Sequence, residues 1–189
     1  MRDPARIFRL RVKTGIGPMM AGATETHLVM LEFEHRRMYD VQLERVRRAL
    51  SGEFVQGTSP VFEQLTDELD EYFAGRRTGF DVPIRLTGTA FQLKVWKALL
   101  RIPSGTTSTY ARVAKSIGAP NAVRAVGKAN GDNRISILVP CHRLLGSDGQ
   151  LVGYGGGLGR KKKLLDVEAR AVNHPLFGAD TLDRSHRAR

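Results

Sequence analysis

The segment AVRAVGKANGDNRISILVPCHR at residues 122–143 decides how the rest of the chain is interpreted. Residues 122–129 favour a helix, and the Asn-Gly-Asp-Asn run at 130–133 is typical of a turn. The β-branched run at 135–139 then favours a strand. That strand would lead directly into Pro140 and Cys141, so the one cysteine of the chain is predicted at a strand end.

Two short helices are predicted around a tight turn before that strand. Residues 111–117 form the first, and Pro120, at a first-turn position, restarts the chain into residues 121–129. Helices joined in this way indicate a helix-turn-helix. In the second helix only Arg124 and Lys128 are long enough to reach base edges, which favours recognition of nucleic acid through shape and backbone. The alternative is a helix whose alanines pack a core.

Cys141 is a candidate nucleophile, because His142 and Arg143 follow it and positive charge favours the thiolate over the thiol. Most lone cysteines of intracellular proteins are buried and inert, so these neighbours carry the interpretation. Adjacent side chains of an extended segment point to opposite faces. We therefore expect a proton relay through water rather than a direct hydrogen bond between Cys141 and His142.

A third group must hold the imidazole of His142 in such a relay. Glu168, on a helix predicted at residues 160–170, is the main candidate, with Asp148 and Asp166 as competitors. Between strand and helix lies the glycine-rich loop at 153–159. It fits neither the P-loop nor the Gly-x-Gly-x-x-Gly spacing, so it does not indicate nucleotide binding. Such a loop can instead lie closely against a flat ligand.

The first half of the chain predicts a small antiparallel sheet with helices. Residues 7–35 have extended character, and residues 41–50 carry apolar side chains at helical spacing. A second helix is expected behind Ser59 as its cap, with Pro60 in its first turn. The predicted fold class is α+β: this N-terminal part, then a mostly helical DNA-binding domain with the helix-turn-helix and the candidate active-site cysteine.

Charge divides the chain near residue 88. Residues 1–88 hold 13 basic and 13 acidic side chains, whereas residues 89–189 hold 17 and 6, so the whole net charge of +11 lies in the second part. This asymmetry favours a polyanionic partner for one domain, although a solvated basic surface gives the same count. We expect domains at 1–88 and 89–171, with a flexible tail at 172–189.

Composition and residue counts exclude several classes of protein. With 41% hydrophobic and 26% charged residues among 189, the chain is globular rather than disordered. No apolar run approaches the roughly 20 residues that span a bilayer. The N-terminus has no secretory pattern, so a cytoplasmic protein is expected, or a nuclear one in a eukaryote. One cysteine and five scattered histidines favour no metal site.

Five motifs together resemble those of the O6-methylguanine-DNA methyltransferase family. The resemblance runs from about residue 17 to residue 169. It is densest at GTAFQ with VW (88–96), IP-x-G (102–105), AVRAVG (122–127), PCHR (140–143) and GY-x-GG (153–157). Asn133 stands eight residues before Cys141, and Glu168 stands 27 residues after it, which is a highly specific spacing.

The resemblance implies that Cys141 takes the alkyl group from O6 of guanine in duplex DNA in one in-line displacement. The group stays on sulfur as a thioether, so each molecule acts once, without a cofactor. O4-alkylthymine is expected as a second substrate. Glu168 would orient His142, which draws the thiol proton through a water, and Asn133 would order the turn that carries the site.

The resemblance also implies that the helix-turn-helix binds the minor groove without sequence preference. Tyr110 would rotate the nucleotide out and donate to the guanine ring, and Arg124 would fill the vacancy in the stack. Further contacts to the base or the DNA are expected from Ala125, Gly127, Lys128, Leu144, Tyr154, Gly155 and Gly156. We expect a monomer without a membrane partner, and cooperative assembly on DNA stays open.

Two positions depart from the family pattern, since Leu144 stands where valine is common and Gly155 offers no side chain. Neither departure removes a chemical group. One competing interpretation is a module without chemistry, either an alkyl-lesion sensor or a helix-turn-helix DNA-binding protein, and Cys141 argues against it. Another is a cysteine hydrolase, which lacks a distant His and Asn pair here.

Overall fold

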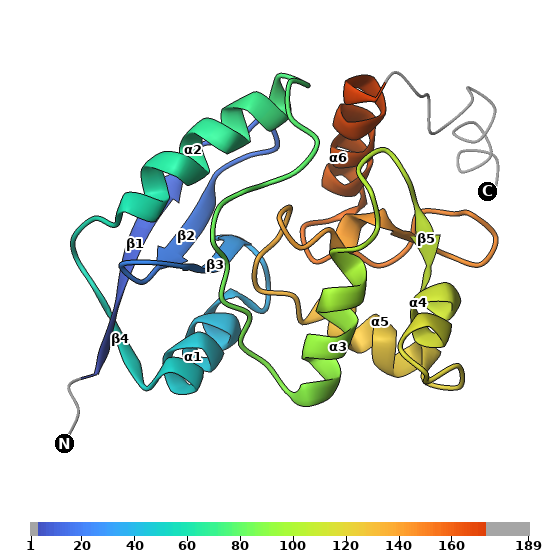
Figure 1. Cartoon of the computed structure of the whole chain (residues 1–189), viewed down its shortest axis with the longest axis horizontal. Helices are drawn as coiled ribbons and strands as arrows, with labels where there is room; N and C mark the ends of the chain where they lie inside the picture. Colours follow the sequence, from blue (N-terminus) through green and yellow to red (C-terminus); the bar gives the residue numbers. More distant parts are fainter. Residues whose placement is uncertain (1–3, 173–189) are drawn as a thin grey trace.

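The structure is a computed structural model, and it describes residues 4–172. Four strands form the main sheet in the order β3-β2-β1-β4 (Figure 1). Their bounds are Ala5–Val12 for β1, Met19–Ala23 for β2, Leu28–Phe33 for β3 and Gly52–Val55 for β4. β1 pairs antiparallel with β2, and β2 with β3, which confirms the strands expected within residues 7–35.

The fourth strand corrects the expectation of a purely antiparallel sheet. β4 runs parallel to β1, with Gly52 opposite Ala5 and Val55 opposite Phe8. A parallel neighbour needs a crossover connection, and helix α1 (Tyr39–Leu50) lies within it. A Cβ at Gly52 would come 2.5 Å from the carbonyl oxygen of Ala5, so the close approach of the strands requires glycine. Four residues directly behind a helix have too little periodicity to predict this strand.

Helices α1 and α2 (Pro60–Phe73) cover opposite faces of the sheet (Figure 1). On one face Val46 of α1 shares a small buried cluster with Ile7 of β1. On the other face α2 packs into the main core. The start of α2 confirms the expected cap, since the Ser59 hydroxyl accepts a hydrogen bond from the Val61 N–H at 3.3 Å and Pro60 stands in the first turn.

The second half is mostly helical, as expected, and lies to the right in Figure 1. Its helices are α3 (Ala90–Leu99), α4 (Tyr110–Ser116), α5 (Val123–Gly131) and α6 (Leu158–Ala171). Two short strands, β5 (Ser108–Thr109) and β6 (Leu144–Leu145), pair in parallel. Helices α4 and α5 form the expected adjacent pair. Because α5 begins at Val123, Pro120 lies in the connecting turn and not in the first turn of the helix.

Residues 135–139 do not form the expected strand. Isolated bridges join Ile135 to Leu31 and Ser136 to Val139, and Ile137 has a φ of +74°. All five residues of the segment are at most 6% exposed. The apolar β-branched composition therefore reflects burial between the two halves of the chain rather than membership of a sheet.

The same segment protects the outer edge of β3, which has no strand beside it. The Ser136 N–H donates to the Leu31 carbonyl at 2.8 Å, and the Leu31 N–H donates to the Arg134 carbonyl at 2.8 Å. Further along this edge the Leu28 N–H donates to the Pro83 carbonyl at 2.8 Å. An edge strand covered in this way cannot pair with another chain. The two halves thus dock through backbone hydrogen bonds as well as through a shared core.

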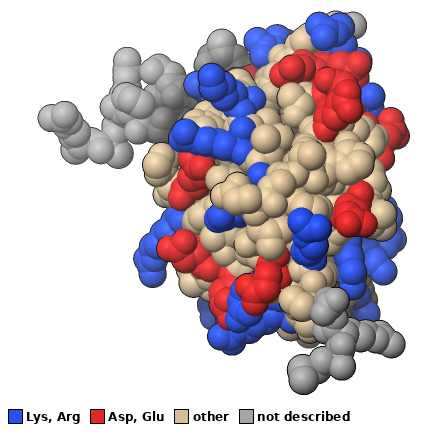
Figure 2. Space-filling view, turned by 90° about the vertical axis from the view of Figure 1, so that its left-hand side faces the viewer, with Lys and Arg blue, Asp and Glu red and all other residues tan. Residues whose placement is uncertain are grey.

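Charge on the face of the N-terminal half is mixed. Viewed from that side, both basic and acidic side chains occur across the face, and several acidic ones gather near the upper right (Figure 2). This agrees with the balance of 13 basic and 13 acidic residues in positions 1–88. Within residues 4–172, no helix is long and apolar enough to cross a membrane. The tail expected at 172–189 lies, apart from its first residue, outside the described residues.

Candidate active site

Cys141 begins a single 3-10 turn, η1 (Cys141–Arg143), directly behind the buried segment 135–139. The expectation of an extended backbone at Cys141 and His142 was therefore wrong, although side chains on successive 3-10 residues also diverge. The side chain of Cys141 is buried. Its Sγ accepts a hydrogen bond from Asn133 Nδ2 at 3.2 Å.

Asn133 is the residue that holds this part of the backbone in place. Its Nδ2 also donates to the Val139 carbonyl at 2.9 Å, and its Oδ1 accepts from the Ile135 N–H at 3.1 Å. The side chain is 1% exposed, so these contacts replace water. The side-chain amide of Asn133 thus links the turn at 130–133 to the sulfur of Cys141, which lies on the other side of the buried segment 135–139.

The protonation of Cys141 differs from the sequence-based expectation. Burial raises the pKa of the thiol, and the Asn133 hydrogen bond and the charges of Arg36 and Lys161 oppose this only in part. The adjacent basic residues therefore do not make it a thiolate, because the cost of burying the charge outweighs them. A reaction at this sulfur needs a base that removes the proton.

His142, the next residue in the chain, pairs with Glu168. His142 Nε2 lies 2.7 Å from Glu168 Oε1, and both side chains are fully buried. Arg143 clamps the same carboxylate, with Nη2 at 2.8 Å from Oε1 and Nε at 2.9 Å from Oε2. The Gly105 N–H donates to Oε2 at 3.2 Å, and the Tyr72 hydroxyl donates to Oε1 at 2.9 Å. Glu168 thus gathers donors from three other segments of the chain.

Burial and Arg143 together decide the protonation states of Glu168 and His142. Burial alone would raise the pKa of Glu168, but His142 and Arg143 lower it to about 2, so the group is a carboxylate. Burial lowers the pKa of His142 and outweighs the attraction of Glu168, so the imidazole is neutral. Its Nε2–H then donates to Glu168, which makes Nδ1 the basic nitrogen. His142 Nδ1 is buried and has no hydrogen-bond partner among the described residues.

The competing acids lie elsewhere. Asp148 Oδ1 accepts from the Gln150 N–H at 3.1 Å within its own loop. Asp166 pairs with Lys162 at 3.0 Å on the surface of α6. Neither contacts the imidazole in the structure.

Lys161 is a buried cation of the site that sequence reasoning missed. Its Nζ donates to the Leu144 carbonyl and, at 2.6 Å, to the Val152 carbonyl. Burial lowers the pKa of this ammonium to about 8. The sequence does carry a signal for the burial of this lysine. Lys161 stands three residues before Leu164 and seven before Glu168, which places all three on the buried face of α6.

The expected pocket residues gather around the glycine-rich loop. The Tyr110 hydroxyl donates to the Gly153 carbonyl at 3.3 Å, and the ring of Tyr154 meets Phe33 edge to face at 6.4 Å. The Tyr154 hydroxyl is buried and unpartnered among the described residues. At Gly156 a Cβ would come 2.6 Å from the Phe33 ring, so the loop lies directly against the end of β3.

The remaining expected residues divide between the core and the surface. Leu144 is fully buried in β6. Gly155 is exposed, and Gly127 faces the ring of Tyr110. Three residues of α5 are exposed together: Arg124, Ala125 and Lys128. The structure therefore buries Leu144 and leaves the long side chains of α5 on the surface.

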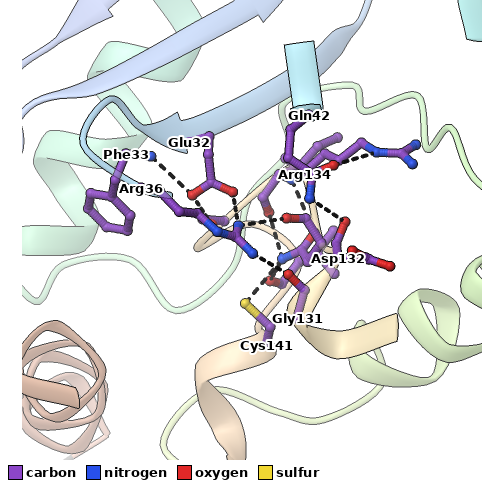
Figure 3. A network of polar contacts seen from close by, with 12 residues as sticks. Glu32, Phe33, Arg36, Gln42, Gly131, Asp132, Arg134 and Cys141 are labelled. Carbon is purple, nitrogen blue, oxygen red and sulfur yellow. Dashed lines mark hydrogen bonds and ion pairs between the residues drawn. The ribbon is translucent and has the colours of Figure 1, made fainter. Parts of the chain in front are cut away.

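A polar network connects the N-terminal half to the turn that carries Cys141 (Figure 3). Glu32, at the end of β3, is fully buried and pairs with Arg36. Arg36 also donates to the Gly131 carbonyl and, at 3.3 Å, to the Asn133 carbonyl. The network thus holds the backbone at both ends of the turn whose Asn133 side chain contacts Cys141. Neither Glu32 nor Arg36 has a signal in the sequence that would place it there.

Comparisons with known proteins agree with this geometry. Residues 11–86 match the family model for the 6-O-methylguanine DNA methyltransferase ribonuclease-like domain, and residues 90–170 match that for its DNA binding domain. The methylated-DNA--protein-cysteine methyltransferase of Mycobacterium tuberculosis is 57% identical over 107 residues. That match covers 57% of this chain and 65% of the length of the mycobacterial relative.

Two further relatives cover more of the molecule. A methylated-DNA--protein-cysteine methyltransferase of Methanosarcina barkeri is 40% identical over 157 residues, which are 83% of this chain and 94% of the relative. A crystal structure of Mycobacterium tuberculosis OGT in complex with DNA is 39% identical, covers 90% of this chain and 95% of its own, and superposes with a TM-score of 0.74. The chain therefore belongs to the 6-O-methylguanine DNA methyltransferase family.

Proposed function

We propose that this protein repairs alkylated DNA by moving the methyl or larger alkyl group from O6 of guanine to the sulfur of Cys141. The observation that carries the proposal is the buried thiol, held by Asn133, next in the chain to a neutral imidazole that Glu168 and Arg143 fix in place. The names of the relatives and the DNA complex of the mycobacterial structure support it. We propose O4-alkylthymine as a second substrate.

The reaction exchanges the thiol hydrogen for the alkyl group. A water accepts the proton of Cys141 and passes one to His142 Nδ1, and the carboxylate of Glu168 stabilises the imidazolium that forms. Sulfur then attacks the alkyl carbon in line, an S–C bond forms, and the C–O6 bond breaks with its electron pair going to guanine. Tyr110 donates a hydrogen bond to the departing base. Because the thioether is stable, each molecule acts once and needs no cofactor.

Access to the lesion requires the base to leave the duplex. We propose that α5 enters the minor groove, where the short side chains of Ala125 and Gly127 permit close approach and Lys128 contacts phosphate. Arg124, exposed on the same helix, fills the space of the extruded nucleotide. The guanine then lies between the Cys141 and Leu144 backbone and the loop that carries Tyr154, Gly155 and Gly156.

The carbonyls of that pocket already have protein donors, since Lys161 binds the Leu144 carbonyl and Asn130 Nδ2 lies 3.4 Å from the Cys141 carbonyl. A carbonyl oxygen has two lone pairs, so each can also accept from the guanine amino group. We propose that residues 1–88 and 89–171 act as two domains and that the protein works as a monomer on chromosomal DNA in the cytoplasm. The excess of 17 basic over 6 acidic side chains in the second half supports this partner.

Mass spectrometry of the protein after mixing with a short duplex that carries one O6-methylguanine tests the proposal. We expect a gain of one methyl group per protein, located on the Cys141 peptide, and no gain with the unmodified duplex. Cys141→Ala should keep duplex binding and lose the transfer. An unchanged mass despite tight binding to the lesion duplex would instead indicate a damage sensor, and repeated turnover of generic esters would indicate a hydrolase.

A further inference from the structure

Tyr72 belongs to the N-terminal half, yet its hydroxyl ends in the polar cluster of the C-terminal half. It lies near the end of α2, is 0% exposed, and donates to Glu168 Oε1 at 2.9 Å across 96 residues of sequence. Its ring is fixed between Phe73, with centroids 5.3 Å apart, and Phe80 at 5.2 Å. Because two aromatic neighbours hold the ring in place, the buried hydroxyl has little freedom to form a hydrogen bond with an atom other than Glu168 Oε1.

The oxygen that Tyr72 contacts is the one that holds the imidazole. Glu168 Oε1 accepts from His142 Nε2 at 2.7 Å, from Arg143 Nη2 at 2.8 Å and from Tyr72. Burial and the neighbouring carboxylate raise the pKa of Tyr72 well above its usual value, so its hydroxyl is only a donor here. The three donors therefore share the charge of a single oxygen.

We propose that Tyr72 is a positioning residue of the alkyl transfer: its hydroxyl fixes the Glu168 oxygen that orients His142 and moderates how strongly that oxygen holds the imidazole proton. The inference rests on the proposed function, because it assigns Tyr72 to the same proton relay. It also means that the N-terminal half contributes a side chain to the chemistry of the C-terminal half.

The direction of the effect follows from electrostatics. A carboxylate oxygen that accepts from several donors is a weaker acceptor for each of them. Other groups also act on His142, since Arg143 and Lys161 disfavour its charged form and Glu168 favours it. Removal of the Tyr72 hydroxyl leaves more of the Oε1 charge to His142, so the pKa of the imidazole should rise. The base would then be protonated, and lost to the reaction, at a higher pH.

Tyr72→Phe tests this with the loss of one oxygen atom and no change in the ring. The single-turnover rate of methyl transfer to Cys141, from a duplex with one O6-methylguanine, is measured between pH 4.5 and 8 in the full-length protein. We expect the acid limb of the profile to move up by about half a pH unit, which lowers the rate on that limb about threefold. The rate at pH 8 should stay within about twofold, and duplex affinity should not change.

Tyr39→Phe is the matched control, because it removes the same atom from α1 of the N-terminal half, away from Glu168. Its profile should coincide with that of the wild type. An NMR titration of the His142 ring gives an independent reading, and it should show a higher pKa in Tyr72→Phe alone. The inference would be overturned if Tyr72→Phe had the same acid limb and the same His142 pKa as the wild type, whether or not the variant is less stable. A wild type that gains no methyl group on Cys141 would instead overturn the proposed function itself.

Discussion

Glu168→Gln is the substitution whose cost the structure defines most directly. The carboxylate is fully buried and accepts from Tyr72, His142, Gly105 and the Nε and Nη2 groups of Arg143. Its pKa is about 2 in the folded protein, against 4.5 for a glutamate in water. At about 1.4 kcal/mol for each pKa unit, the difference contributes about 3 kcal/mol to the free energy of unfolding at pH 7. Loss of one partner of a buried ion pair costs about 3–5 kcal/mol, which agrees.

The pH dependence has a definite sign. Because folding lowers the pKa of Glu168, its stabilising contribution is complete above pH 4.5 and disappears as the pH falls toward 2. Glutamine cannot titrate, so the difference in free energy of unfolding between wild type and variant should be about 3 kcal/mol at pH 7. By the same linkage it should fall to less than half of that at pH 3.

Urea denaturation followed by circular dichroism at pH 7, 5 and 3 measures this difference. Asp166→Asn is the control on the same helix, since Asp166 makes only a surface pair with Lys162. That substitution should change stability by about 0.5 kcal/mol or less at every pH. A Glu168→Gln deficit that is the same at pH 3 as at pH 7 would refute the reasoning, because the lost interaction would then not depend on an ionised Glu168.

Three other substitutions have expected outcomes. Arg124→Ala should slow methyl transfer from the duplex about tenfold with a smaller loss of duplex affinity, because extrusion becomes harder; equal losses of both would contradict its role. Lys161→Met should lower the free energy of unfolding by about 1–3 kcal/mol, because the buried Leu144 carbonyl and the Val152 carbonyl both lose the Lys161 ammonium as donor. Thermal denaturation beside the exposed Lys163→Met checks this, and equal effects of the two substitutions would contradict it. Gly105→Ala should lower the free energy of unfolding more than Gly118→Ala does, as measured by urea denaturation. Both glycines have a φ near +74°, but an added Cβ clashes with a neighbour only at Gly105. Equal losses of stability would show that the structure relaxes around the clash.

Local signals in the sequence predicted the parts of the fold that local interactions decide. Ser59 caps α2 as expected, and Thr89 forms a capping box with Gln92 at the start of α3. The pair of helices around residue 118 is also present. Of the three candidate acids, Glu168, Asp148 and Asp166, Glu168 is the one that contacts His142. Here the helical spacing of α6 placed Glu168 on the buried face with the leucines, whereas Asp166 is half exposed.

The features that were not predicted depend on how the two halves dock. Residues 135–139 have the composition of a strand, but burial between the halves, and not pairing, explains it. The thiolate expected at Cys141 came from counting its charged neighbours, whereas the pKa is set first by loss of solvent. Solvent exclusion at a site made by two distant segments has no periodic signature along the chain.

The site is assembled across the division that charge and the family matches both place near residue 88. The half with no net charge contributes several polar side chains that reach the other half, among them Glu32, Arg36 and Tyr72. Arg36 holds the backbone of Asn133, which contacts the sulfur of Cys141, and Tyr72 donates to the Glu168 oxygen that contacts His142. Buried polar groups cost free energy unless all their partners are in place. Correct docking of the N-terminal half is therefore a condition for the geometry at Cys141.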